Sequence, residues 1–278
     1  MKMLVRSKKS PLRQFLLTAM LSLFASSSHA SSQNAPAATT TQHPALFLVG
    51  DSIVHTGTGA GDTGPWGWGA EFIPMFDSTK IHVYNEGLGG RSSRGYIQEG
   101  AWAKILDQLQ PGDWVIIQFG HNDAANSQNY PDRTTLKGNG DETQEIESPV
   151  THQKETIHSY GWYLRQYVAD AKAKSATVII CSPPPRNLWL EGNVVRGLDG
   201  YASWAADAAR TSGARFIDLN TISADKYDAL GQEATKPYFN DFQHSRKTGA
   251  RLNAESVAAG IRRLKDCALT ADLLPATR

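Results

Sequence analysis

One serine and a distant aspartate–histidine pair are the residues of this chain best suited to nucleophilic chemistry. Ser52 ends the tripeptide Gly50-Asp51-Ser52, directly after the apolar run LFLV. A serine attacks a carbonyl when a base lies within hydrogen-bond reach and a third group orients that base. Among the eight histidines, His244 alone has an aspartate, Asp241, three residues earlier, and one turn can bring such a pair side by side. We expect Ser52, His244 and Asp241 to act as nucleophile, base and orienting carboxylate; a plain turn and a loop ion pair are the alternatives.

Two further residues are candidate donors to a developing oxyanion. Attack on an ester builds negative charge on the carbonyl oxygen, and fixed donors must point at that charge. Gly90, in NEGLGGRS, permits close approach to its backbone N–H, and Asn122, in FGHND, carries a side-chain amide. These two groups are predicted oxyanion donors, although Gly90 could merely turn the chain and Asn122 could cap a loop.

The elements that must position these residues alternate between short β-rich runs and helical patterns. The apolar runs predict strands at 45–49, 81–85, 114–119, 177–181 and 215–218, and three- to four-residue periodicity predicts helices at 102–109, 153–174, 201–211 and 248–264. This alternation predicts an α/β fold of three layers, α/β/α, around a five-stranded parallel sheet. Ligands of such sheets bind at the carboxyl ends of the strands, which is where the candidate residues fall.

The first thirty residues have the layout of a secretory signal peptide. A basic segment without acidic residues precedes a short apolar core, and Ser28-His29-Ala30 supplies a cleavage site. We expect residues 1–30 to be removed on export to the periplasm or the extracellular space, an uncleaved anchor being the alternative. Residues 31–43 are predicted to be a disordered leader and residues 44–278 a single domain.

Charge and cysteine content exclude several classes of function. Removing the five basic residues of the signal segment leaves 23 basic and 27 acidic residues, a balance unfavourable to nucleic acid or membrane binding. The two cysteines are Cys181, inside an apolar strand, and Cys267. Export would permit a disulfide, but Cys181 is typical of a buried free thiol. Asp241 and His244 lack a third metal ligand at a recognisable spacing, so neither a metal nor a cofactor is expected.

Four blocks, in order, resemble the SGNH (GDSL) hydrolase family. They are GDS with Ser52, NEGLGGRS with Gly90, GHND with Asn122, and DFQH with Asp241 and His244, and the likeness runs from residue 46 to the last helix. The resemblance implies a flavodoxin-like fold, a Ser52–His244–Asp241 triad, an oxyanion hole of Ser52, Gly90 and Asn122, and no metal or cofactor.

Within that family the chain is most similar to rhamnogalacturonan acetylesterases, on the segments GWGAEF, GGRSSRGYIQEG, FGHND, KETIHSYGWYLRQYV and DFQHSRKTGA. The resemblance implies an esterase that removes O-acetyl groups from the rhamnogalacturonan backbone of pectin through an acetyl-enzyme. Because of the signal segment we expect a secreted enzyme, and we expect a monomer. The alternatives are an esterase of acetylated xylan, of another carbohydrate or of a lipid, and a non-catalytic carbohydrate-binding protein. No exposed hydrophobic stretch is obvious in the loops, which argues against a lipid substrate.

Three residues are predicted to contact the substrate. Trp66 could stack on a sugar ring, whereas Trp68, at the start of an expected helix, is assigned to the core. Arg91 or Arg186 could bind the carboxylate of a uronic acid. The loop that follows Ser52, with sequence IVHTGTGAGDTGPWGWG, departs from the family pattern and could alter the rim of the site.

Overall fold

The computed structural model describes residues 43–58, 60–61, 63–124, 132–148 and 152–276. Contacts divide the chain into two units, Met1–Thr41 and Gln42–Arg278, and every described residue belongs to the second. The predicted signal peptide and the predicted leader up to residue 42 lie outside the described residues, so both stay predictions.

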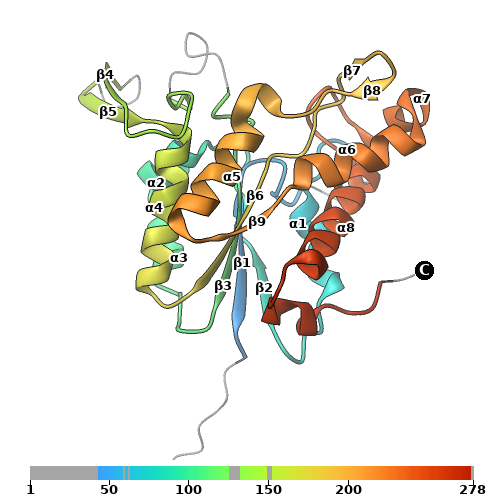
Figure 1. The fold of residues 1–278 in the computed structure, drawn as a ribbon, viewed down its shortest axis with the longest axis horizontal. Coiled ribbons are helices and arrows are strands. Elements are labelled where there is room, and N and C mark those ends of the chain that lie inside the picture. Colours follow the sequence, from blue (N-terminus) through green and yellow to red (C-terminus); the bar gives the residue numbers. More distant parts are fainter. Residues whose placement is uncertain (1–42, 59, 62, 125–131, 149–151, 277–278) are drawn as a thin grey trace, which may run out of the picture. The chain divides into compact units, whose positions relative to one another are not determined.

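A five-stranded parallel sheet forms the centre of the described unit (Figure 1). The strand order is β2-β1-β3-β6-β9, and all four pairings are parallel. The strands are β1 (Ala45–Gly50), β2 (His82–Asn85), β3 (Trp114–Gln118), β6 (Thr177–Cys181) and β9 (Arg215–Ile217). Each lies within one residue of its predicted bounds, and the predicted α/β fold is confirmed.

Helices cover both faces of the sheet. They are α1 (Trp68–Phe72), α2 (Ser93–Gln98), α3 (Ala101–Leu106), α4 (Tyr160–Ala173), α5 (Tyr201–Ser212), α6 (Leu219–Leu230), α7 (Gln232–Thr235) and α8 (Lys247–Arg263), with 3₁₀ turns at Ile73–Met75, Leu198–Gly200, Lys236–Tyr238 and Ala268–Asp272. Figure 1 shows α2 to α5 on one side of the sheet and α1, α6 and α8 on the other.

Alternate residues of the central strands supply the two cores. Phe47 and Val49 pack on the α2–α5 side, whereas Leu46 and Leu48 pack on the α1–α8 side. Because the central strands are buried on both faces, their sequences are continuous apolar runs, which is why their bounds could be read from the sequence. Trp68 is fully buried, as predicted.

Two small hairpins extend from the end of the unit where the parallel strands finish (Figure 1). One pairs β4 (Thr143–Glu147) with β5 (Lys154–His158), and the other pairs β7 (Trp189–Leu190) with β8 (Asn193–Val194). The predicted helix at 153–174 is therefore wrong in its first part. The helix begins only at Tyr160, because residues 154–158 pair with β4 and Ser159 caps the helix by accepting the N–H of Trp162 at 3.1 Å.

Both cysteines are buried free thiols, as the apolar setting of Cys181 indicates. Burial raises the pKa of the Cys181 thiol well above its ordinary value. Within the described part of the chain, no helix has the length and apolar character needed to cross a membrane.

Candidate active site

Ser52 lies in the turn that follows the carboxyl end of β1. A Cβ atom at Gly50 would lie 2.4 Å from the carbonyl oxygen of Gln118 and equally close to the side chain of Val54, so the chain passes where only glycine fits. Directly afterwards the carbonyl of Asp51 accepts the N–H of Val54 at 3.1 Å. This tight turn directs the Ser52 hydroxyl out of the sheet edge.

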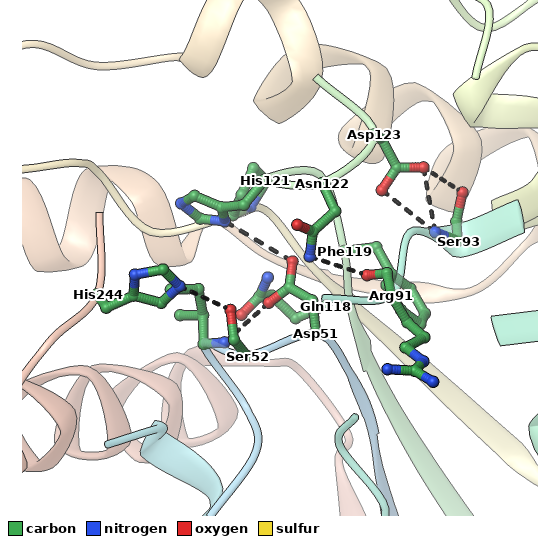
Figure 2. A network of polar contacts seen from close by, with 12 residues as sticks. Asp51, Ser52, Arg91, Ser93, Gln118, Phe119, His121, Asn122, Asp123 and His244 are labelled. Carbon is green, nitrogen blue, oxygen red and sulfur yellow. Dashed lines mark hydrogen bonds and ion pairs between the residues drawn. The ribbon is translucent and has the colours of Figure 1, made fainter. Parts of the chain in front are cut away.

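The structure brings His244 and Asp241 to this serine. His244 Nε2 lies 3.1 Å from Ser52 Oγ, and Figure 2 shows the two side chains pointing toward each other. His244 Nδ1 lies 2.8 Å from Asp241 Oδ2. The other carboxylate oxygen of Asp241 accepts the backbone N–H groups of Gln243 at 2.8 Å and of His244 at 2.7 Å. The predicted nucleophile, base and orienting carboxylate therefore lie in hydrogen-bonding order.

The charge state of Asp241 fixes the tautomer of the histidine. Partial burial works to raise the pKa of Asp241, but the N–H groups of His244 and Gln243 and the imidazole itself outweigh it, so this pKa lies below its ordinary value. An ionised carboxylate only accepts hydrogen bonds, so His244 Nδ1–H donates to Asp241. His244 Nε2 is then the acceptor that faces the Ser52 hydroxyl, as a general base requires.

The loop of His244 is held by its neighbour, Ser245, which the sequence reasoning did not single out. The Ser245 hydroxyl donates to the carbonyl of Trp66 at 2.9 Å, and the Ser245 carbonyl accepts the N–H of Trp66 at 2.8 Å. The N–H of Asn240 closes the loop on the carbonyl of His244 at 2.8 Å. A serine beside a histidine is too common a pattern to have indicated this role.

Gly90 lies in a turn that is tied to the end of β1. The N–H of Leu88 donates to the carbonyl of Gly50 at 2.9 Å, and Arg91 N–H closes the turn on Leu88 at 3.3 Å. Gly90 has φ 78°, a left-handed conformation that favours glycine. The turn therefore places the Gly90 backbone beside the nucleophile turn.

Each predicted oxyanion donor has an N–H hydrogen that can still bind a ligand. Within the described residues, no protein acceptor takes the N–H of Ser52 or of Gly90. Asn122 Nδ2 donates to the carbonyl of Arg91 at 3.1 Å, as Figure 2 shows. Since an amide nitrogen carries two hydrogens, Asn122 retains one for a ligand while the other fixes its orientation.

A buried carboxylate and imidazole lie beneath the nucleophile. Asp51 Oδ1 accepts the N–H of Ile53 at 2.9 Å, which supports the turn, and Asp51 Oδ2 lies 3.9 Å from His121 Nδ1 (Figure 2). Burial raises the pKa of Asp51 to about 7. Burial first, and then the positive charge of Arg186, lower the pKa of His121 to about 3. His121 is therefore a neutral imidazole at neutral pH, and the contact is not a full ion pair.

A second buried carboxylate, Asp123, joins the loops that carry Gly90 and Asn122. It accepts both the hydroxyl of Ser93 and, at 3.1 Å, the N–H of Ser93 (Figure 2). Burial raises the pKa of Asp123 to about 6. The Tyr201 hydroxyl donates to the Asp123 carbonyl at 3.0 Å. This link was not predicted from the sequence, although Asp123 directly follows Asn122.

The structure does not favour the predicted stacking of Trp66 on a sugar. Its exposed fraction is 8 %, and its indole N–H donates to Glu71 at 3.1 Å. The Lys247 ammonium lies 5.7 Å from the ring centre, and Gly57 and Gly61 approach the ring closely. Contacts with Gly57, Gly61 and Lys247 bury the Trp66 ring, which the local sequence alone did not predict.

Two arginines lie near Gly90. The Arg91 guanidinium is paired with Glu99 at 2.9 Å and donates to the carbonyl of Gly89 at 2.9 Å. The guanidinium of Arg133, which the sequence reasoning did not identify, lies 3.3 Å from where a Cβ of Gly90 would be.

Arg186 lies on the His244 side of the site. Its guanidinium carbon is 5.6 Å from the ring centre of Phe242, the residue that follows Asp241. Among the described residues, no hydrogen bond or ion pair of the Arg186 side chain is found, and its Nε is buried without a partner. Exposed hydrophobic side chains also occur here, at Leu188, Leu190, Val195 and Phe242, contrary to the expectation that these loops carry none.

No group of three or more histidine, cysteine or acidic side chains suited to a metal is found in the described ranges. The site consists instead of a serine, an imidazole and a carboxylate beside free N–H donors. That arrangement, at the carboxyl edge of a parallel sheet, is typical of serine hydrolases.

The pattern of the GDSL-like lipase/acylhydrolase family matches residues 48–252. The chain therefore belongs to this family and is a carboxylic ester hydrolase. The resemblance inferred from the four sequence blocks is confirmed.

Two named relatives are similar to the chain over most of its length. The chain is 32% identical over 212 residues to a rhamnogalacturonan acetylesterase of Emericella nidulans, covering 76% of this chain and 82% of that protein. It is also 32% identical to the probable rhamnogalacturonan acetylesterase YesY of Bacillus subtilis, covering 79% of this chain and 93% of that protein.

Solved structures share the fold at lower identity. The YxiM protein of Bacillus subtilis superposes with a TM-score of 0.64 at 23% identity, covering 80% of this chain and 57% of that chain. Axe2, an acetylxylan esterase from Geobacillus stearothermophilus, superposes with a TM-score of 0.53 at 18% identity, covering 78% of this chain and 93% of that chain.

Proposed function

We propose that this chain is an exported serine esterase that removes O-acetyl groups from a plant cell-wall polysaccharide, namely the rhamnogalacturonan backbone of pectin. The observation that carries the chemistry is the 3.1 Å approach of His244 Nε2 to Ser52 Oγ, with Asp241 on the opposite nitrogen. The substrate rests on the two relatives that are named rhamnogalacturonan acetylesterases.

The reaction begins with attack by Ser52 on the acetyl carbonyl. Ser52 Oγ bonds to the carbonyl carbon while its proton passes to His244 Nε2, and the imidazolium is stabilised by Asp241. The negative charge on the carbonyl oxygen is met by the N–H groups of Ser52 and Gly90 and by the free amide hydrogen of Asn122.

Collapse of this intermediate breaks the bond to the sugar oxygen, which takes the proton from His244. The acetyl group is then held as an ester of Ser52. Water, deprotonated by His244, attacks that ester, releases acetate and returns the proton to Ser52 Oγ. Acylation and deacylation of Ser52 therefore need only residues of this chain and water.

The decisive experiment compares Ser52→Ala and His244→Ala with the wild type on 4-nitrophenyl acetate. Each is expected to lose about 10²-fold or more of kcat, because the nucleophile or the general base is gone. Ser203→Ala and His82→Ala are matched controls on the surface and should retain wild-type rates. Wild-type turnover by both folded site variants would refute the mechanism.

A non-catalytic carbohydrate-binding protein on this fold is tested by a serine-directed organophosphate. The wild type should be labelled covalently at Ser52 and lose activity in proportion to labelling. Sugar binding without labelling would favour the binding protein.

Acetylated xylan is the second candidate substrate, because Axe2 shares the fold. Acetate release from acetylated rhamnogalacturonan and from acetylated xylan, at equal acetyl content, separates the two. We expect the higher kcat/KM on rhamnogalacturonan, and the reverse order would reassign the substrate.

Export as a monomer completes the proposal. The basic segment, the short apolar core and Ala30 support cleavage after residue 30. Fractionation of cells that make the whole chain, with N-terminal sequencing and light scattering of the product, should find a processed monomer outside the cytoplasm.

A further inference from the structure

An exposed apolar rim borders the site on the side of His244. Eight large hydrophobic side chains are exposed in the described residues, and four of these, Leu188, Leu190, Val195 and Phe242, belong to the β7–β8 segment or to the loop of Asp241 and His244. Apolar side chains gathered at one exposed place mark ligand-binding surfaces more often than scattered ones do.

Backbone hydrogen bonds join the β7–β8 segment to the loop of Phe242. The N–H of Asn187 donates to the carbonyl of Phe242 at 2.8 Å, and the N–H of Val195 donates to the carbonyl of Leu188 at 2.8 Å. Phe242 lies between Asp241 and His244 in sequence, so the rim is fixed directly to the catalytic loop. Its exposed fraction is 57 %, in contrast to the buried Trp66.

Arg186 brings a positive charge to the same place. Its guanidinium lies against the Phe242 ring at 5.6 Å, within the range of a cation–π contact. No ion pair joins it to an acidic side chain in the part of the chain that the structure describes, whereas Arg91 is already paired with Glu99. A guanidinium stacked on a ring keeps its in-plane N–H donors, and these match the two oxygens of a carboxylate.

We propose that Arg186 and Phe242 form a subsite for a uronic acid residue beside the acetylated sugar. The Arg186 guanidinium binds the uronate carboxylate, and the exposed face of Phe242 packs against the apolar face of the sugar ring. This assignment rests on the proposed function, and it selects Arg186 over Arg91 as the uronate ligand.

The chemistry of the rim favours a sugar over an acyl chain. A fatty acyl chain gains nothing from a half-buried guanidinium, and placing apolar carbon over that charge would remove it from water without a partner. A pyranose carries both C–H faces and polar edges, and a uronate adds a carboxylate that can pair directly with the Arg186 guanidinium.

The test uses two oligosaccharides that differ only in charge. One is an acetylated rhamnogalacturonan oligosaccharide, and the other is the same material after reduction of its galacturonate carboxyl groups to alcohols. Arg186→Gln should raise KM about ten-fold to a hundred-fold on the acidic substrate, since a charge-assisted contact is lost, and much less on the reduced one. Phe242→Ala should raise KM on both, and Phe242→Tyr should restore it.

Controls and a second measurement guard against misfolding. Arg263→Gln and Leu230→Ala change exposed side chains on α8 and α6 and should leave both KM values at the wild-type level. If Arg186→Gln unfolds, Arg186→Lys keeps the charge but not the planar fork and should show a smaller, equally charge-selective loss. Calorimetric binding of both oligosaccharides to Ser52→Ala, with and without Arg186→Gln, repeats the comparison without turnover.

Three outcomes would overturn the proposed subsite. If the wild type releases acetate from both oligosaccharides but Arg186→Gln is impaired equally on both, the subsite is wrong and the proposed function stands. If the wild type acts on neither, both proposals fail. If Phe242→Ala slows 4-nitrophenyl octanoate more than it slows the oligosaccharides, the rim serves an acyl chain and the sugar assignment is overturned.

Discussion

His244 Nε2 and Ser52 Oγ lie 3.1 Å apart although 192 positions separate the two residues in the sequence. The parallel sheet accounts for this approach, since Ser52 follows β1 and His244 lies in the loop before α8, which packs on the same sheet. Asp241 then holds the imidazole from the far side at 2.8 Å. Three residues from the two ends of the domain thus form one hydrogen-bonded line.

Replacing Asp241 with asparagine tests whether the carboxylate fixes the tautomer. The amide oxygen can still accept the N–H groups of Gln243 and His244, so the loop should keep its shape. The amide nitrogen, however, cannot accept from Nδ1–H, and His244 would no longer present an unprotonated Nε2 to Ser52. We expect kcat on 4-nitrophenyl acetate to fall about 10²- to 10⁴-fold with little change in melting temperature.

Asp207→Asn, on the exposed surface of α5, is the matched control for this substitution and should leave kcat at the wild-type level. A wild-type kcat in Asp241→Asn would show that the carboxylate has no part in catalysis.

The strands and the three candidate residues that follow them could be predicted because each depends on local sequence. Ser52 and Asn122 follow the central strands β1 and β3, which are buried apolar runs, and Gly90 follows the more exposed edge strand β2. Since parallel strands end at one edge, finding the strands was enough to bring these residues together.

Other features depend on contacts that no local pattern records. Residues 154–158 are a strand because β4 lies beside them, and α1 and α2 are too short to show a period. Trp66 is buried because a glycine-rich loop and Lys247 close over it. The sequence offered Arg186 as a candidate uronate ligand, but its contact with Phe242 forms only on folding, so the pair could not be predicted.

Asn122→Ala should remove one oxyanion donor without disturbing the nucleophile. The wild-type amide uses one hydrogen on the Arg91 carbonyl at 3.1 Å, so the other is held in a fixed direction. Losing such a preorganised donor costs about 10²- to 10³-fold in kcat, with KM nearly unchanged because the charge exists only in the transition state. Steady-state kinetics on 4-nitrophenyl acetate would check this, with Gln232→Ala, an exposed amide at the start of α7, as the control. A loss confined to KM would place Asn122 in ground-state binding instead.

Gly50→Ala should destabilise the protein. The added Cβ would lie 2.4 Å from the Gln118 carbonyl oxygen, a backbone atom of the neighbouring strand that cannot move without disturbing β1–β3 pairing. Overpacking of this kind costs about 1–3 kcal/mol, visible as a lower melting temperature. Gly95→Ala in α2 is the matched control, because a Cβ there would meet no atom closer than 3.5 Å. Equal melting temperatures for the two variants would contradict the crowding at Gly50.

Asp51→Asn should change how stability depends on pH. The pKa of Asp51 is about 7 in the folded protein against an ordinary 3.8, so the folded state holds this proton more tightly than the unfolded state. The stabilisation from that proton is fully present below about pH 3.8 and is lost as the pH rises through about 7.

Asparagine cannot ionise, so the free energy of unfolding of Asp51→Asn should rise relative to the wild type between pH 4 and pH 8, at about 1.4 kcal/mol for each unit of pKa difference. His121 has the opposite dependence, because its lowered pKa destabilises the folded state as the pH falls, but it is present in both proteins and cancels in the difference. Urea unfolding at unit steps of pH measures this difference directly. A difference that stays constant from pH 4 to pH 8 would mean that Asp51 is ionised throughout in the folded protein, as a carboxylate held by a charged His121 would be.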